Sequence, residues 1–295
     1  MHVTDRYSVK IAKQMQDQNI QILFGARNAG PVTARALLNL KGVTYIKSYK
    51  DLAPYFSGAK QWVEPMYGLI GGASMTFDLD REEEGVEGVQ PTLPEMTEAA
   101  LRNLSRNATS PDGKGFFLMV EGGSIDWGGH ARDPGWVLSD VIEFDQAVET
   151  AYDWAQTRDR DTLIVVCSDH ETGGLAVDPL TTDYTAIARQ KATTEYTWGL
   201  IKKGKISIQK ALTTYMGIPD PTAPEITLVN DYGQMGLSDV LSARDNVAWG
   251  WSGHDDGDHT ATPVPVRAWG PGAYLFNGAH ENEYVGTELK KAVSN

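Results

Sequence analysis

Residues 116–130 read Phe-Phe-Leu-Met-Val-Glu-Gly-Gly-Ser-Ile-Asp-Trp-Gly-Gly-His. The run of five apolar residues predicts a buried strand, and the acid and two glycines after it predict the turn that ends the strand. Asp126 and His130 lie four residues apart, a spacing that puts both side chains on one face of a helical turn. Ligands of open α/β sheets bind beyond the carboxyl ends of strands. Glu121, Asp126 and His130 are therefore candidate metal ligands.

A second apolar stretch, residues 162–167, repeats this design. It is rich in β-branched residues and is followed, after one serine, by Asp169 and His170. Adjacent aspartate and histidine at the end of a strand are again ligand types that suit Zn²⁺. The strand–helix–strand order from residue 116 to residue 167 predicts a crossover unit that brings both ligand turns to the same edge of a sheet.

A third stretch, residues 254–261, reads His-Asp-Asp-Gly-Asp-His-Thr-Ala and precedes a strand-like Val-Pro-Val-Arg-Ala-Trp. Either His254 or His259 is a candidate ligand. Each of the three stretches taken alone is also compatible with a solvated loop. Together they hold four of the six histidines of the chain, which argues against a chance arrangement.

The order of these motifs resembles the alkaline phosphatase family. The features shared are Glu-Gly-Gly-Ser-Ile-Asp-x-x-x-His, a strand ending in Asp-His, and His-Thr-Ala ahead of Val-Pro-Val and Gly-Pro. The resemblance implies an α/β fold, a three-layer α/β/α sandwich, and a site with two Zn²⁺ and one Mg²⁺. It assigns Asp126, His130 and His259 to one zinc, Asp169 and His170 to the other, and Glu121 to magnesium. It also favours His259 over His254 and makes Trp127 a wall of the phosphate pocket.

The start of the chain resembles the family segment His-Val-Thr-Ser-Arg, which makes Arg6 the residue that clamps the phosphate. In the family the nucleophilic serine, the aspartate that bridges two metals and a magnesium-binding threonine all precede this arginine. The chain contains no Asp-Ser pair. We therefore expect it to correspond to the C-terminal two-thirds of the family, without the first strands of the sheet and without a catalytic nucleophile.

The function implied by the resemblance is phosphomonoester hydrolysis by an alkaline phosphatase, with the chain as given inactive alone. The ligands implied are small phosphate esters and inorganic phosphate, and the location implied is the periplasm or the extracellular space. One alternative is another hydrolase of the same superfamily, a phosphodiesterase or a phosphonate hydrolase. A second is a non-catalytic metal- or phosphate-binding protein derived from a phosphatase.

Composition and charge argue against several other classes of protein. The chain has 295 residues and a net charge of −13, which argues against a nucleic-acid surface because phosphates require a basic partner. No run of 18 apolar residues occurs, so the sequence predicts no membrane span. The one cysteine, Cys167, excludes an intrachain disulfide and is predicted to be an inert core residue.

The chain is expected to form an α/β core from residues 1–178 and 248–295, interrupted by an insertion at 179–247. The insertion is interpreted as cap-like, as a homodimer contact or as surface decoration. Thr92 and Glu95 form a capping box that predicts a helix to about residue 104. Apolar periodicity predicts a helix over 137–156 with its acids on a solvated face: Asp140, Glu143, Asp145, Glu149 and Asp153. Helices are predicted at 9–15 and 31–40, and strands at 20–24, 43–48 and 67–71.

Overall fold

The computed structural model describes residues 14–15, 17–18, 20–26, 40–72, 74–108, 115–158, 160–250 and 258–293. Arg6, His254 and most of the helices predicted at 9–15 and 31–40 lie outside these residues. None of the helices in the described ranges combines the length and the apolar character needed to cross a membrane.

The first part of the core is a three-stranded parallel sheet in the order β1-β3-β2. Its strands are β1 (Ile22–Ala26), β2 (Thr44–Ile46) and β3 (Met66–Ile70). Every residue of β3 is buried, and its first three residues pair with a strand on both sides. The strands predicted at 20–24, 43–48 and 67–71 are confirmed to within two residues at each end. Helix α3 (Tyr49–Phe56) follows β2 and buries Leu52 and Tyr55.

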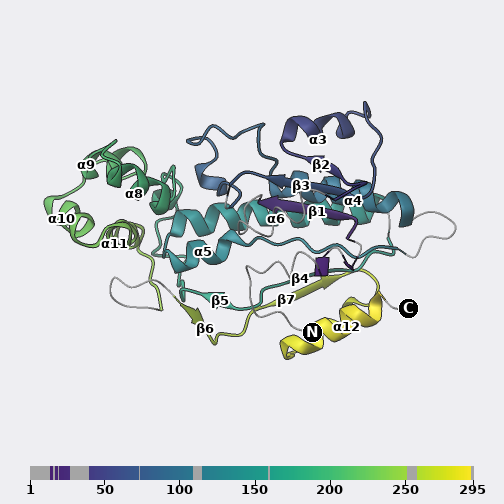
Figure 1. The fold of residues 1–295 in the computed structure, drawn as a ribbon. Helices are drawn as coiled ribbons and strands as arrows, with labels where there is room; N and C mark the ends of the chain where they lie inside the picture. Colours follow the sequence, from purple (N-terminus) through teal and green to yellow (C-terminus); the bar gives the residue numbers. More distant parts are fainter. Residues whose placement is uncertain are drawn as a thin grey trace.

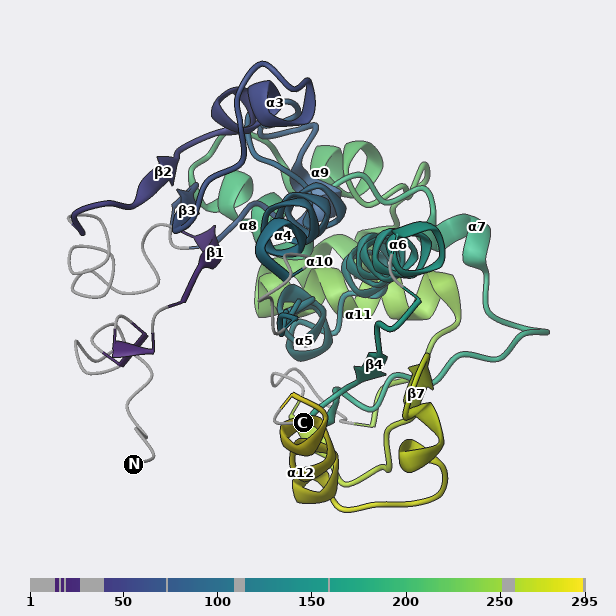
Figure 2. The same ribbon diagram turned by 90° about the vertical axis from the view of Figure 1, so that its right-hand side faces the viewer.

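Two long helices, α4 (Leu93–Ala108) and α6 (Pro134–Arg158), pack against each other beside this sheet (Figures 1 and 2). The capping box that predicts the start of α4 is present. The backbone N–H of Thr92 donates to Glu95 Oε2 at 2.8 Å, and the N–H of Glu95 donates to Thr92 Oγ1 at 3.3 Å. These bonds satisfy two of the backbone donors that a helix start leaves unpaired.

The prediction that Asp140 and Glu143 lie on a solvated face of α6 is wrong. Asp140 is 3% exposed and accepts hydrogen bonds from Ser124 Oγ at 2.6 Å, Trp136 Nε1 at 2.7 Å and the N–H of Asp78 at 3.1 Å. Glu143 accepts from the N–H of Leu93 at 2.9 Å. Burial raises the pKa of both carboxyls, and these hydrogen bonds oppose the rise.

The buried strand predicted at 116–120 is also not found. Residues 115–121 form neither a strand nor a helix, and they pair with no strand among the described residues. Phe117 is 59% exposed and Met119 is 71% exposed. The segment leads into a short helix, α5 (Ser124–His130), so the predicted turn and helical spacing are confirmed although the strand before them is not.

The last part of the core pairs β4 (Ile164–Cys167) with β7 (Val266–Trp269) in an antiparallel ladder, so the predicted parallel crossover is replaced by a different pairing. In Figures 1 and 2 this ladder lies between the layer of α5 and α6 and the terminal helix α12 (Asn282–Ala292). Cys167 is exposed, contrary to the prediction of a core residue, because it is the last residue of β4.

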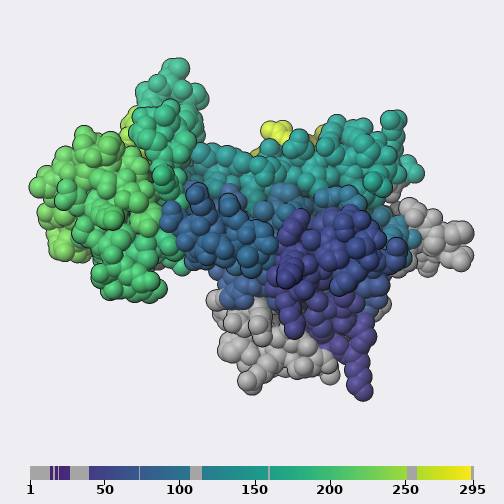
Figure 3. Space-filling view, turned by 90° about the horizontal axis from the view of Figure 1, so that it is seen from above, coloured from purple at the N-terminus to yellow at the C-terminus, as the bar shows by residue number. Residues whose placement is uncertain are grey.

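Residues 184–245 form a group of helices with a core of its own, seen in green in Figures 1 and 3. The helices are α7 (Tyr184–Ile187), α8 (Thr194–Lys202), α9 (Ile208–Thr214), α10 (Ala223–Tyr232) and α11 (Gln234–Asp245). The core comprises Leu212, Met216, Ile218, Val229, Leu237, Val240 and Leu241. An antiparallel bridge between Ala176 and Ala248 joins the two ends of this helical group. The boundaries 179 and 247 stay a prediction.

Buried carboxylates fasten the helical group to the core. Asp80, in the 3₁₀ turn η1 (Asp78–Asp80), accepts hydrogen bonds from the N–H of Thr193 at 2.6 Å and from Thr193 Oγ1 at 2.8 Å. Asp133, which precedes α6, accepts from the N–H of Thr194 at 2.7 Å and from Gln190 Nε2 at 2.8 Å. The three bonds from Thr193 and Thr194 hold the N-terminus of α8 against the core.

Candidate metal centre

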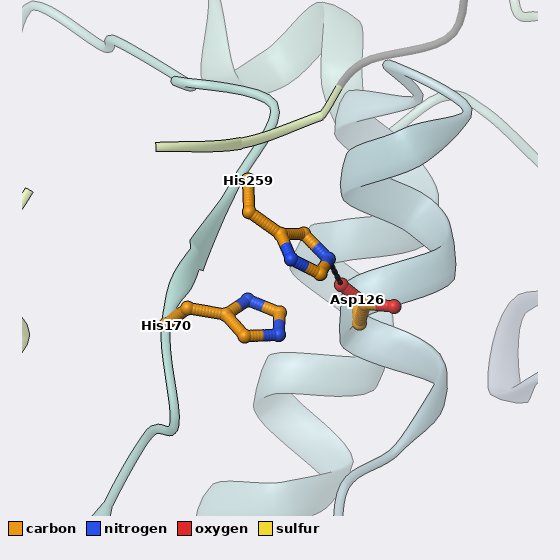
Figure 4. Close-up of side chains that lie close together, drawn as sticks. All are labelled: Asp126, His170 and His259. Carbon is orange, nitrogen blue, oxygen red and sulfur yellow. Dashed lines mark ion pairs between the residues drawn. The ribbon is translucent and has the colours of Figure 1, made fainter. Parts of the chain in front are cut away.

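Three side chains from separate elements converge at one end of the core. Asp126 comes from α5, His170 directly precedes β5 (Glu171–Thr172), and His259 begins β6 (His259–Thr260). Their ligand atoms all lie within 4.8 Å of one another, and Figure 4 shows the rings and the carboxylate turned toward a common point. The antiparallel pairing of β5 with β6 places Thr172 opposite His259.

A close approach between α5 and β5 makes this convergence geometrically possible. A Cβ atom at Gly129 would lie 2.9 Å from the carbonyl oxygen of Thr172 and 3.0 Å from its Cβ. Only glycine fits there without a shift of the backbone. At the start of the same helix, Ser124 is anchored to the buried Asp140. The orientation of α5, and with it that of Asp126, is therefore fixed at both ends.

The distances within one set of three residues match a tetrahedral metal site. Asp126 Oδ1 lies 3.5 Å from His130 Nε2 and 3.5 Å from His259 Nε2, and the two Nε2 atoms are 3.2 Å apart. A tetrahedral Zn²⁺ with bonds of about 2.1 Å separates its ligand atoms by roughly 3.4 Å. One carboxylate and two imidazoles are also donors that zinc accepts, so these residues fit the ion.

A second pair lies beside this set. Asp169 Oδ2 is 3.4 Å from His170 Nε2, again the separation of two ligands of one tetrahedral ion. The imidazole of His170 stacks on that of His259 with 3.5 Å between ring centroids. Asp169 itself has 79% of its side chain exposed. The pair therefore offers two ligands at a solvent-facing position next to the set of three.

Thr172 connects the two groups, and the sequence analysis does not identify it. Its hydroxyl lies 2.6 Å from Asp126 Oδ1 and 3.2 Å from His170 Nδ1. Since a carboxylate only accepts, the single hydroxyl proton goes to Asp126, and the hydroxyl oxygen must accept from His170. The neutral tautomer compatible with this contact carries its proton on Nδ1, which leaves the lone pair of Nε2 for a metal. The period of two along a strand, which puts residues 170 and 172 on one face, is the signal that identifies Thr172.

The remaining predicted site residues lie apart from this cluster or outside the described ranges. Glu121 is exposed at the end of segment 115–121 and is not a member of the cluster. Trp127 is 47% exposed, and its ring meets Phe77 edge-on at 5.8 Å. Together with His130 it lines a hollow of about 270 Å³ that also includes Trp136, Glu195, Gln234 and Met235. Arg6 and His254 lie outside the residues that the structure describes.

Comparisons with known proteins agree on one family. The family model for alkaline phosphatase matches residues 8–295. Alkaline phosphatase 3 of Bacillus subtilis is 30% identical over 265 residues, which cover 85% of this chain and 52% of that protein. The repressible alkaline phosphatase of Saccharomyces cerevisiae is 29% identical over 260 residues, covering 77% of this chain and 44% of its own length. The chain thus spans about half the length of the curated relatives it matches.

Solved structures agree on the fold. The cold-active alkaline phosphatase of a psychrophilic Shewanella superimposes with a TM-score of 0.76 at 22% identity, covering 96% of this chain and 68% of that one. A variant of the alkaline phosphatase of the Antarctic bacterium TAB5, solved with Mg bound in the M3 site, gives a TM-score of 0.53 at 21% identity. It covers 97% of this chain and 64% of its own. The predicted α/β fold is confirmed, and the chain belongs to the alkaline phosphatase family.

Proposed function

We propose that this chain carries the metal centre of a phosphomonoester hydrolase. The observation that carries the proposal is the set Asp126, His130 and His259, whose ligand atoms are 3.2 to 3.5 Å apart. In this proposal these residues hold one Zn²⁺, Asp169 and His170 contribute to a second, and Glu121 contributes to a Mg²⁺ site. Metal ions at these residues supply the positive charge that stabilises phosphoryl oxygens during an in-line displacement.

The chain's own residues prepare the site for that chemistry. Thr172 donates to Asp126 and favours the neutral tautomer of His170 that has its proton on Nδ1. Arg6 would bind two phosphate oxygens through its planar guanidinium. A local cluster of cations also overcomes the overall charge of −13, which by itself repels a phosphate ester. The ligands of the site are then small phosphate esters and inorganic phosphate.

Turnover through a covalent intermediate also needs an activated nucleophile. The chain contains no Asp-Ser pair. We therefore propose that residues 1–295 bind phosphate in a metal-dependent way and hydrolyse phosphomonoesters near the background rate. A homodimer contact through residues 179–247 and a periplasmic or extracellular location belong to the same proposal, because both follow from the family.

The test measures metal, phosphate and turnover separately. After dialysis against a weak chelator, the protein should keep one Zn²⁺ that binds clearly more tightly than any other. With zinc and magnesium added, inorganic phosphate should bind and an aryl phosphate should turn over only at background. Finding no zinc, or no metal-dependent phosphate binding, contradicts the proposal. Turnover on the order of 1 per second or more would show that another group acts as nucleophile.

Substrate preference in the same assay separates the alternatives. Hydrolysis of a phosphate diester or a phosphonate in preference to the monoester would assign the chain to another hydrolase class of the superfamily. Tight zinc and phosphate binding without turnover, even when the N-terminal segment of a related alkaline phosphatase is supplied, would identify a non-catalytic phosphate-binding protein.

A further inference from the structure

The strand pairing that completes the metal centre is very short. Strands β5 and β6 contribute two residues each and lie side by side at one end of the core (Figure 1). Their antiparallel register pairs Glu171 with Thr260 and Thr172 with His259. Strands this short and this polar specify their register only weakly through the backbone, so a side-chain contact is needed to fix it.

The register decides whether His259 belongs to the site, because successive side chains of a strand point to opposite faces. His170 and Thr172 share one face of β5, and both approach Asp126 (Figure 4). His259 lies opposite Thr172 and therefore on the same face of the ribbon. A slip of one residue would turn the imidazole of His259 to the other face and away from the carboxylate of Asp126.

Glu171 and Thr260 form a hydrogen bond on the other face of this ribbon. The hydroxyl of Thr260 donates its single proton to Glu171 Oε2, since an ionised carboxylate only accepts. The same hydroxyl oxygen accepts from the N–H of Thr262 at 3.4 Å. Both side chains are half-buried, where a hydrogen bond to a charged group is stronger than in open solvent. A slip of one residue would put the two side chains on opposite faces and break this bond, so the bond selects the observed register.

Glu171 also joins β5 to the turn that ends it. Its Oε1 accepts from the N–H of Gly174 at 2.8 Å. Gly173 and Gly174 have φ angles of 83° and 65°, a conformation that glycine adopts without strain. Through this turn the N–H of Gly173 donates to the carbonyl oxygen of Asp258 at 2.9 Å. Both oxygens of the Glu171 carboxylate are thus engaged within the ribbon, and Glu171 is not a member of the ligand cluster.

We propose that Glu171 is a positioning residue of the metal centre, and that its hydrogen bond to Thr260 fixes the register of β5 and β6. The fixed register keeps His259 beside Asp126, so the site is arranged before a metal ion binds and little ordering of β6 is needed. Glu171 acts through this bond, and neither through its charge nor as a metal ligand. The proposal rests on the proposed function, because it concerns the zinc site assigned there.

Glu171→Met and Glu171→Gln are a matched pair of variants, because both remove the charge and keep nearly the same length. Only glutamine can still bond to the hydroxyl of Thr260 and to the N–H of Gly174. In zinc titrations against a chelating dye, Glu171→Met should bind zinc about 10- to 100-fold more weakly than the unaltered chain, the usual cost of losing a residue that supports metal ligands. Glu171→Gln should keep most of the affinity. Glu149→Ala, which removes an exposed acid of α6, should keep all of it.

A measurement on metal-free protein reports the register directly. In the unaltered chain and in Glu171→Gln, a nuclear Overhauser effect should connect Thr172 with His259 across the ribbon. In Glu171→Met this contact should weaken, because β6 can slip and place Asp258 or Thr260 opposite Thr172. An unchanged contact in Glu171→Met overturns the proposal whatever the zinc affinity. Equal loss of zinc affinity in the methionine and glutamine variants also overturns it, because the effect would then come from the charge.

Variants of Thr260 test the same bond from its other side and decide the question if Glu171→Met does not fold. Thr260→Val should weaken zinc binding as much as Glu171→Met, whereas Thr260→Ser should keep the affinity. The double variant Glu171→Met/Thr260→Val should lose no more than either single variant, because both changes remove one bond. Additive losses overturn the proposal. Absence of zinc binding in the unaltered chain, with the Overhauser contact responding as expected, would instead contradict the proposed function and support the role of Glu171 in the register.

Discussion

At the scale of single residues, the sequence identifies most of the metal cluster but not its geometry. Asp126, His130 and His170 are recognisable because they follow apolar runs, and His259 because it precedes one. All four also fit a family pattern. Their distances depend on the pairing of β5 with β6 and on the close approach of Gly129 to Thr172. Thr172 is missed because its role arises from two partners, one of them 46 residues away.

His259→Ala should abolish the tightest zinc site, because it removes one of the three ligand atoms that match a tetrahedral ion. The variant is compared with the unaltered chain by zinc titration against a chelating dye. His280→Ala is the matched control, since His280 stacks on Tyr284 away from the cluster. His254→Ala should also keep the site. Loss of tight zinc in either control, or its retention in His259→Ala, contradicts the ligand assignment.

Thr172→Val should lower zinc affinity about 10- to 100-fold, the usual cost of losing a residue that orients metal ligands. Thr172→Ser keeps the hydroxyl and should keep the zinc affinity. If Thr172 acted only through its shape, valine would keep the affinity better than serine. The nitrogen chemical shifts of His170 in metal-free protein report which ring nitrogen carries the proton. The preference for Nδ1 should be lost in the valine variant and kept in the serine variant. Thr181→Val, an exposed threonine outside the cluster, should change neither quantity.

At the scale of elements, local sequence signals predict helix starts reliably, whereas contacts between residues far apart in the chain cannot be predicted from them. The capping box at Thr92 and Glu95 predicts the start of α4 because all the atoms involved lie within one turn. The burial of Asp140 cannot be inferred in this way, since its partner Asp78 belongs to a turn 62 residues earlier in the chain. Residues 116–120 before α5 have the composition of a core strand, yet an apolar segment is buried only where neighbours cover it.

The contact between η1 and α8 should make stability depend on pH. Burial raises the pKa of Asp80 from 3.8 to about 7, and the hydrogen bonds from Thr193 only partly oppose this. Between those values the folded state holds a proton that the unfolded chain has released. The free energy of unfolding should therefore fall as pH rises through this window, by up to about 1.4 kcal/mol per pH unit, and level off above it.

Urea unfolding across this pH range provides the measurement. Asp80→Asn removes the titrating group and should flatten the dependence, whereas Asp145→Asn, which alters an exposed acid of α6, should leave it unchanged. Burial raises the pKa of Asp245 to about 7 as well, so Asp245→Asn should act in the same direction. A pH profile identical in Asp80→Asn and the unaltered chain would refute the assignment.

At the scale of the whole molecule, the exposed apolar side chains of residues 115–121 should control solubility. Phe117 and Met119 lie on a segment that pairs with no strand in the described residues, and exposed apolar surface of this kind promotes association. The double variant Phe117→Ser/Met119→Ser should bind less hydrophobic dye and aggregate less on heating. Leu180→Ser, at a residue 93% exposed in another part of the chain, is the control and should have a smaller effect. A monodisperse, cooperatively melting protein whose dye binding is the same in the double variant would refute this expectation.

The bridge between Ala176 and Ala248 has an evolutionary consequence. The bridge brings the two ends of the helical group side by side. The segment of about 70 residues between them can therefore become longer or shorter, or be replaced, while the core strands keep their positions. Several contacts with the core restrict that freedom, among them the ion pair of Arg132 with Asp239 and the hydrogen bond from Gln190 to Asp133. Thr193 and Thr194 must meet the core carboxylates, and Ser238 must donate to the carbonyl oxygen of Ala131, one residue beyond His130. Relatives that share this core can thus vary the surroundings of the candidate metal centre by replacing a single helical unit.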